Sequence, residues 1–85
     1  MAVYELRIKK EAEKEIRELP KPEIKKVVKK IQTLPENPRP MGCEKLKGEE
    51  GYRIRQGDYR IVYTIDDSKK TISIIRVGHR KEVYR

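Results

Sequence analysis

The chain has 85 residues, which is enough for one domain with a small core. Its single cysteine, Cys43, excludes an internal disulfide framework, and with a single histidine it offers no ligand set for a structural zinc ion. No apolar run is long enough to cross a membrane, and the first residues lack the pattern of a secretion signal. We therefore expect one domain over residues 1–85, in the cytoplasm, with no metal or other cofactor.

The charge balance is strongly basic. Lys and Arg number 22 against 14 Asp and Glu, so the net charge is +8 and the pI about 9.7. Such a surface favours nucleic acid, membrane phosphates or an acidic protein as partner, although a domain can also be basic without a polyanionic partner. Three arginines lie in residues 1–50 and six in residues 51–85. Because the planar guanidinium group suits bidentate phosphate binding, we expect the chemistry in residues 51–85.

The first half of the chain predicts a strand followed by a helical hairpin. Apolar residues alternate over residues 3–8, which is typical of a strand. The period then becomes helical, with a first stripe at Ala12, Ile16 and Leu19. Prolines at positions 20 and 22 end the first helix and begin the second. The apolar stripe of the second helix comprises Ile24, Val27, Val28, Ile31 and Leu34.

The second half predicts a β-meander after a proline-rich loop at 35–42. Strands are indicated by alternation with a period of two, and the last of them reads as a central strand that Gly78 ends. The predicted strands are a short one at 45–47, then 52–56, 59–65 and 71–77. The fold class is therefore α+β: an N-terminal strand, an αα-hairpin and an antiparallel β-meander, with the helices packed on one face of the sheet.

The second helix carries a dense group of lysines, which comprises Lys25, Lys26, Lys29 and Lys30. Like charges four residues apart on a helix are mildly destabilising. One interpretation is a solvated face that glutamates of the first helix partly neutralise. The other is a patch that contacts the backbone of structured RNA and reads its shape and charge.

A second basic group is predicted on the sheet. Arg53 and Arg55 share one face of a strand, and Arg60 follows the turn at 57–58, so that hairpin pairing can bring it opposite them. Like charges on one sheet face are better explained by an anionic ligand than by folding, and three independent exposed arginines are the alternative. His79 lies beside Arg80 after the last predicted strand, where either a functional or a packing role is open.

Taken together, these segments resemble the RelE/ParE toxin superfamily over nearly the whole chain. The resemblance rests on the Leu46-x-Gly48 spacing, the Tyr-Arg-x-Arg run at 52–55, the Gly-Asp-Tyr-Arg turn at 57–60 and the Val-Gly-His-Arg and Val-Tyr-Arg elements after position 76. It implies a toxin that a cognate antitoxin neutralises. RelE-type members are implied to be ribosome-dependent mRNA endoribonucleases, whereas ParE-type members act on DNA gyrase. A non-catalytic RNA- or protein-binding module of the same fold is the third interpretation.

The resemblance is stronger to the RelE branch. Arg60, Arg80 and Tyr84 fall where RelE-type toxins carry their active-site arginines and C-terminal tyrosine. Arg53 and Arg55 fall where that branch has basic residues, often lysines, in the corresponding strand. The resemblance thus implies an active site in this part of the chain, with ribosomal RNA and mRNA as partners beside the antitoxin.

The chemistry of RNA cleavage fits these side chains. RNA supplies its own nucleophile, the 2′-OH, so an enzyme can act by positioning it and by stabilising the extra charge on the phosphate, without a metal. Arginine can stabilise the charge on the phosphate but cannot act as the base, because its pKa exceeds about 12. Tyr84 and His79 are the two candidates for the base, and the sequence leaves the choice open. Attack by the 2′-OH would leave a 2′,3′-cyclic phosphate.

Overall fold

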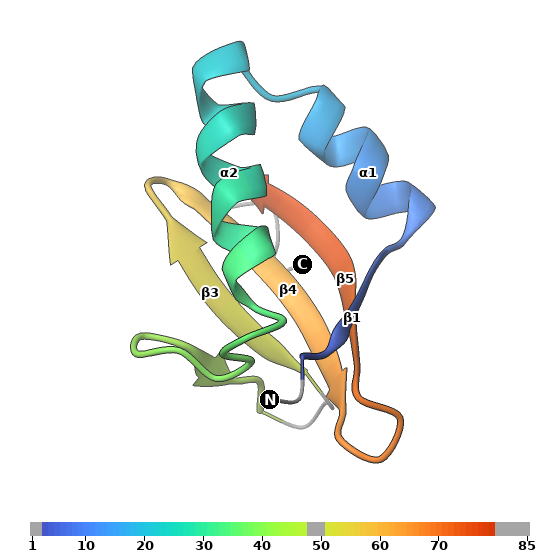
Figure 1. The fold of residues 1–85 in the computed structure, drawn as a ribbon. Helices are drawn as coiled ribbons and strands as arrows, with labels where there is room; N and C mark the ends of the chain where they lie inside the picture. Colours follow the sequence, from blue (N-terminus) through green and yellow to red (C-terminus); the bar gives the residue numbers. More distant parts are fainter. Residues whose placement is uncertain (1–2, 48–50, 80–85) are drawn as a thin grey trace.

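The computed structural model describes residues 3–47 and 51–79. Within them, two helices lie over one face of a five-stranded sheet (Figure 1), which confirms the α+β prediction. The elements in chain order are β1 (Glu5–Ile8), α1 (Lys10–Arg17), α2 (Lys21–Thr33), β2 (Glu44–Lys45), β3 (Tyr52–Gln56), β4 (Tyr59–Asp66) and β5 (Thr71–His79).

The helices begin and end where the sequence predicts. Pro20 is the N-cap of α2 and Pro22 lies in its first turn. Backbone N–H groups of the first turn have no hydrogen-bond partner within the helix, so a proline there costs no helical hydrogen bond. The predicted stripes face the sheet: Val27 and Ile31 of α2 are fully buried, as is Ala12 of α1. Among the described residues, no helix is long and apolar enough to cross a membrane.

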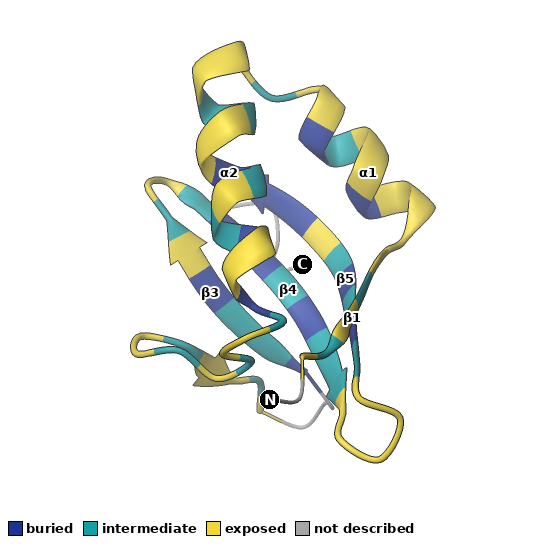
Figure 2. Cartoon of the chain, in the orientation of Figure 1, coloured by how far each residue is buried: buried dark blue, intermediate teal, exposed yellow. Residues whose placement is uncertain are grey.

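The strand order is β1-β5-β4-β3-β2, with β1 parallel to β5 and every other pair antiparallel. β5 lies between β1 and β4, as its β-branched composition predicts. The core lies between this sheet and the helices (Figure 2). Its sheet side consists of Ile54, Ile61, Tyr63, Ile72, Ile74 and Val77.

β5 differs from the prediction at its end. We expected Gly78 to end the strand, but the ladder continues, with Gly78 opposite Arg60 and His79 opposite Tyr59. A glycine in a strand is tolerated when a neighbouring chain or side chain needs the space. The register also shifts by one residue near Ile75, a bulge that local alternation does not reveal. Because β5 is longer than predicted, it pairs with the first residues of β4, Tyr59 and Arg60.

The short strand β2 and the edge strand β1 also depart from expectation. β2 is Glu44–Lys45, one residue earlier than the strand predicted at 45–47. In β1, the alternation over residues 3–8 sets Ile8 on the same side as Tyr4 and Leu6, yet Ile8 is 40% exposed. The reason is that Ile8 ends an edge strand, where neighbouring elements cover the chain on one side only.

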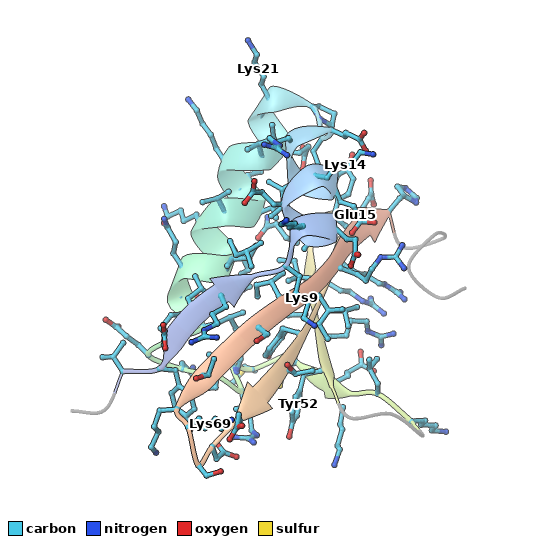
Figure 3. The ribbon with its side chains drawn as sticks, turned by 90° about the vertical axis from the view of Figure 1, so that its right-hand side faces the viewer. Lys9, Lys14, Glu15, Lys21, Tyr52 and Lys69 are labelled. Atoms are coloured by element: carbon cyan, nitrogen blue, oxygen red, sulfur yellow. The ribbon has the colours of Figure 1, made fainter. Side chains whose placement is uncertain are left out.

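Helix α1 covers the part of β5 that β1 does not reach. β1 pairs with β5 only as far as Ile74. Beyond that point Glu15 of α1 accepts the Val77 N–H at 2.9 Å and forms an ion pair with Arg76 at 3.2 Å (Figure 3). An open strand edge invites pairing with other chains, so Glu15 both closes the edge and fixes α1 against β5.

Arg39 anchors the proline-rich loop. Its guanidinium group pairs with Asp67 at 2.9 Å, donates to the Tyr52 hydroxyl at 3.1 Å and lies over the Tyr52 ring. The Arg39 hydrogen bond, followed by one from Tyr4, holds the pKa of Asp67 below its ordinary value. The Tyr63 hydroxyl adds a hydrogen bond to the Pro38 carbonyl at 2.7 Å. These contacts tie the loop to the sheet and thereby set the position of β2.

Candidate active site and nucleic-acid interface

The β3–β4 hairpin gathers three arginines on one face of the sheet. Its two-residue turn begins at Gly57, whose φ of 62° is readily adopted by glycine. The resulting register sets Arg55 directly opposite Arg60, with Arg53 two residues further along. Successive side chains of a strand point to opposite faces, and the intervening Ile54 belongs to the core under the helices. Arg53, Arg55 and Arg60 therefore lie on the face away from the helices, which we call the arginine face.

Two of these arginines are largely withdrawn from solvent. Arg60 is 9% exposed and the Arg53 side chain 11%, whereas Arg55 is exposed. Gly78 is the neighbour of Arg60 on β5 and places no side chain beside it. The planar guanidinium group is the donor that proteins use for bidentate binding of phosphate. The arginine face is therefore suited to an anion such as a phosphate of RNA.

Glu44 is a member of this face that the sequence analysis missed. β2 sets it opposite Arg53, and its carboxylate pairs with the Arg53 guanidinium at 2.8 Å. The hydrogen bond and charge of Arg53 lower the pKa of Glu44, with smaller contributions from the charges of Arg55 and Arg60. Glu44 thus stays ionised at neutral pH and occupies one arginine as a phosphate oxygen would.

His79 does not join the arginine face. It lies opposite Tyr59 in the β4–β5 ladder, and the two rings meet edge to face with centroids 6.0 Å apart. Because Tyr59 and Arg60 are consecutive, their side chains point to opposite sides of the sheet, so His79 lies on the helix side with Tyr59. Arg80 and Tyr84 lie outside the described residues. Of the predicted catalytic residues, the described part of the chain thus sets only Arg60 on the arginine face.

The lysines of α2 form a separate surface, the lysine face, which comprises Lys25, Lys26, Lys29 and Lys30. Lys25, Lys26 and Lys29 are exposed and Lys30 is half-buried. Lys26 pairs with Glu23 of the same helix at 3.8 Å. The proposed neutralisation by the first helix is not what the described ion pairs show, since the α1 glutamates Glu13 and Glu15 pair with Arg17 and Arg76. Figure 1 shows α2 over one side of the sheet, and the strand register turns Arg53, Arg55 and Arg60 to the other side. The helix that carries the lysine face and the arginine face thus lie on opposite sides of the sheet.

Removal of the Glu44 charge should strengthen RNA binding. Glu44→Gln keeps the shape of the side chain but frees Arg53 for a phosphate, so the affinity for single-stranded RNA should rise. The slope of log K against log salt should steepen by up to about 0.7, the contribution of one phosphate contact. Binding titrations at several salt concentrations measure both effects.

Glu5→Gln is the matched control for this experiment, because Glu5 also pairs with an arginine, Arg7, but on strand β1. It should leave RNA binding unchanged. Equal affinities for Glu44→Gln and wild type at every salt concentration would show that RNA does not use Arg53.

Comparison with solved structures identifies the class of protein, because the same arrangement of helices and strands occurs in RelE toxins. The chain matches the toxin–antitoxin complex RelBE2 of Mycobacterium tuberculosis with a TM-score of 0.82 and 31% identity, over 92% of this chain and 99% of that one. It matches the RelE–RelB complex of Pyrococcus horikoshii with a TM-score of 0.83 and 29% identity, over 94% and 98%. Isolated RelE of Escherichia coli gives a TM-score of 0.78 and 35% identity, over 95% and 90%.

Sequence comparison gives the same assignment. Residues 6–84 match the family model described as the ParE toxin of the type II toxin–antitoxin system parDE. A relative from Methanocaldococcus jannaschii that carries the name RelE1 is 31% identical over 96% of both chains. The chain therefore belongs to the RelE/ParE superfamily of type II toxins, as the sequence motifs implied.

Proposed function

We propose that this toxin is a ribosome-dependent mRNA endoribonuclease of the RelE branch, which inhibits translation in the cytoplasm and is neutralised by a cognate antitoxin. The observation that carries the proposal is the arginine face, where the hairpin register gathers Arg53, Arg55 and Arg60. The names of the relatives support the RelE branch, because several are RelE proteins and two of the matched structures are complexes with an antitoxin.

The arginine face is suited to cleavage by the 2′-OH of RNA. A base takes the 2′-OH proton, the O2′ atom attacks the phosphorus, and the bond from phosphorus to O5′ breaks to leave a 2′,3′-cyclic phosphate. In this proposal Arg60 holds the scissile phosphate and stabilises the charge that develops on it, while Arg53 and Arg55 orient the RNA backbone. Arg80 would donate a hydrogen bond to the leaving O5′ atom, and Tyr84 would act as the base. None of these steps requires a metal.

The two basic surfaces support dependence on the ribosome. A chain with the arginine face on one side and the lysine face on the other can bind mRNA and ribosomal RNA at the same time. Contacts to phosphates fix position and orientation without reading sequence. Ribosomal RNA on the lysine face would thus hold the toxin so that the codon meets the arginine face. Binding to the ribosome would then align the 2′-OH with the phosphorus, which arginines alone do not achieve.

The lysine face gives a direct test of this arrangement. Changing all four of its lysines to glutamine should weaken ribosome binding and flatten its salt dependence, by about 0.7–0.9 in slope for each phosphate that the lysines no longer neutralise. Folding should be unaffected or slightly improved, because like charges four residues apart are removed. Sedimentation with ribosomes at several salt concentrations measures the change.

A control with the same change in net charge removes four lysines outside α2, namely Lys9, Lys10, Lys14 and Lys69. If both quadruple variants bind ribosomes equally weakly, only the net charge matters. If both bind as wild type does, the lysine face is a solvated surface with no role in ribosome binding.

Primer extension on an mRNA in a translation extract tests the proposed activity. Cuts within translated codons, abolished by omitting ribosomes or by adding the antitoxin, are the expected result. Intact mRNA together with gyrase-dependent DNA breaks would instead identify a ParE-type toxin. Ribosome binding with intact mRNA and intact DNA would identify a non-catalytic module.

A further inference from the structure

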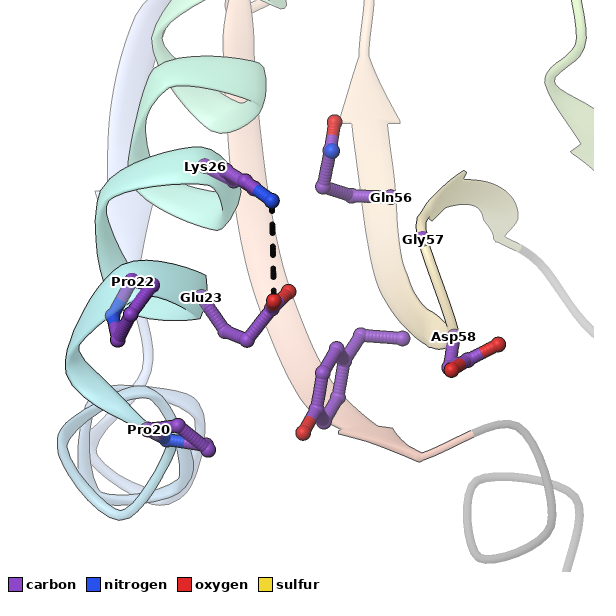
Figure 4. A pocket seen from close by; sticks show the side chains of 8 residues that line it. Pro20, Pro22, Glu23, Lys26, Gln56, Gly57 and Asp58 are labelled. Atoms are coloured by element: carbon purple, nitrogen blue, oxygen red, sulfur yellow. Dashed lines mark ion pairs between the residues drawn. The ribbon is translucent and has the colours of Figure 1, made fainter.

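A groove on the helix side of the sheet takes no part in the cleavage steps proposed above, although it shares Lys26, Lys29 and Lys30 with the lysine face. It begins as a pocket of about 330 Å³ between the first turn of α2 and the β3–β4 hairpin (Figure 4). The lining residues are Pro20, Pro22, Glu23, Lys26, Gln56, Gly57, Asp58 and Tyr59. It adjoins a second hollow of about 270 Å³ that shares Lys26 and Gln56 and adds Lys29, Lys30 and Thr33. We call the two together the hairpin groove. Its first pocket has the size of a small-molecule site.

Glu23 supplies an acceptor in the first pocket. Its side chain is 27% exposed, and one oxygen lies 3.8 Å from the Lys26 ammonium group. The other oxygen would lie 3.9 Å from a Cβ atom at Gly57, so the carboxylate reaches from α2 toward the hairpin turn. In Figure 4 the carboxylate points into the space between helix and hairpin. Two carboxylate oxygens side by side can accept a pair of parallel N–H bonds.

Tyr59 and two prolines give the same pocket flat, stiff walls. Tyr59 is half-buried, and its edge-to-face contact with His79 restrains the ring. Pro20 and Pro22 belong to the start of α2 and have no rotatable side chain. Aromatic side chains are the surfaces on which proteins stack the unpaired bases of single-stranded RNA. The pocket thus combines a stacking wall with a carboxylate.

We propose that the hairpin groove binds a guanine nucleotide of single-stranded RNA, with the base in the first pocket and its phosphates along Lys29 and Lys30. Guanine carries two adjacent donors, N1–H and N2–H, on its Watson–Crick edge, which match the two oxygens of Glu23. On the Watson–Crick edges of adenine, cytosine and uracil, each N–H donor has an acceptor atom as its neighbour. A carboxylate oxygen facing that acceptor would be repelled by it. The inference goes beyond the proposed function, because it adds base recognition on the side opposite the arginine face.

The flanking charges decide between RNA and a protein ligand. An arginine side chain could also donate two parallel bonds to Glu23. Asp58, in the lining of the first pocket, would favour that cation. Lys26, Lys29 and Lys30 line the second hollow, where their like charges oppose a cation and attract phosphate. A guanine nucleotide brings a donor edge for the carboxylate and negative charge for the lysines in one ligand.

Titration of the ¹⁵N-labelled toxin with mononucleotides tests the proposal without any cleavage. We expect 5′-GMP to shift the amide signals of Gln56, Gly57 and Asp58 and to bind about ten- to a hundredfold more tightly than AMP, CMP or UMP, the discrimination typical of a bidentate base contact. Guanosine, which lacks phosphate, should shift the same signals with lower affinity. Glu23→Gln should reduce the preference for guanine to near parity while leaving the weaker binding of the other nucleotides.

Glu13→Gln is the matched control, because it removes a carboxylate that pairs with Arg17 on α1, away from the groove. It should keep the guanine preference. Equal affinity of wild type for all four nucleotides, or shifts from GMP confined to the arginine face, would overturn the proposal. So would tighter binding of an arginine-containing peptide than of GMP at these amides, which would make the groove a protein site. If the toxin cleaves mRNA on ribosomes but shows no guanine preference, the hairpin-groove proposal is wrong and the proposed function stands.

Discussion

Replacement of Arg60 by alanine should slow single-turnover cleavage of mRNA on programmed ribosomes by about 10²–10³-fold, the usual effect of removing one group that stabilises transition-state charge. Arg60 is the most buried member of the arginine face and lies between Arg55 and Gly78 in the ladder. Arg60→Lys should restore only part of the rate, because lysine keeps the charge but loses the planar pair of donors. The rate must be measured at saturating toxin, so that weaker ribosome binding does not contribute.

Arg7→Ala is the matched control for Arg60→Ala. Arg7 lies on the edge strand β1, is largely exposed and pairs with Glu5, so its removal should leave the rate unchanged. Thermal unfolding of both variants reports on folding. A folded Arg60→Ala toxin that cuts at the wild-type rate would remove Arg60 from the active site.

The sequence was sufficient to predict the arginine face because its geometry is local. The Gly57-Asp58 turn joins two alternating segments, and a two-residue turn sets Gln56 opposite Tyr59. Every further pair of the hairpin follows from that one, including Arg55 opposite Arg60. The helices were equally predictable, since Pro20 and Pro22 mark their boundary and the apolar stripes show their buried sides.

What the sequence did not predict depends on contacts between distant segments. Glu44 meets Arg53 because Arg39 anchors the preceding loop to Asp67, 28 residues away in the chain. Glu15 caps the Val77 N–H across 62 residues. Neither contact leaves a periodic signal, because each involves one exposed or half-buried polar side chain rather than a repeating apolar pattern.

The same distinction applies to His79. Its position beside Arg80 in the sequence made it a candidate base, whereas the β5 ladder continues through Gly78 and sets His79 with Tyr59 on the helix side. The two extra ladder pairs, Gly78 with Arg60 and His79 with Tyr59, thus decide on which side of the sheet the imidazole lies. This placement favours a residue other than His79 as the base that takes the 2′-OH proton.

Tyr84→Phe should therefore cost about 10²–10⁴-fold in the single-turnover rate, the usual contribution of a general base. Phenylalanine keeps the ring and deletes only the hydroxyl, so the slower rate reports proton transfer rather than packing. His79→Gln should cut near the wild-type rate, because its contact is with Tyr59 on the far side of the sheet. Both variants are compared with wild type on programmed ribosomes at saturating toxin and across a range of pH.

The pH profile separates a catalytic tyrosine from a structural one. With Tyr84 as the base, the wild-type rate should rise with pH as the phenol ionises, and Tyr84→Phe should lose this rise as well as the rate. Tyr63→Phe is the control, since the Tyr63 hydroxyl is committed to the Pro38 carbonyl and its removal should lower stability without changing the pH profile. The opposite pattern, a fully active Tyr84→Phe and an inactive His79→Gln, would make His79 the base and would require the end of β5 to turn toward the arginine face on the ribosome.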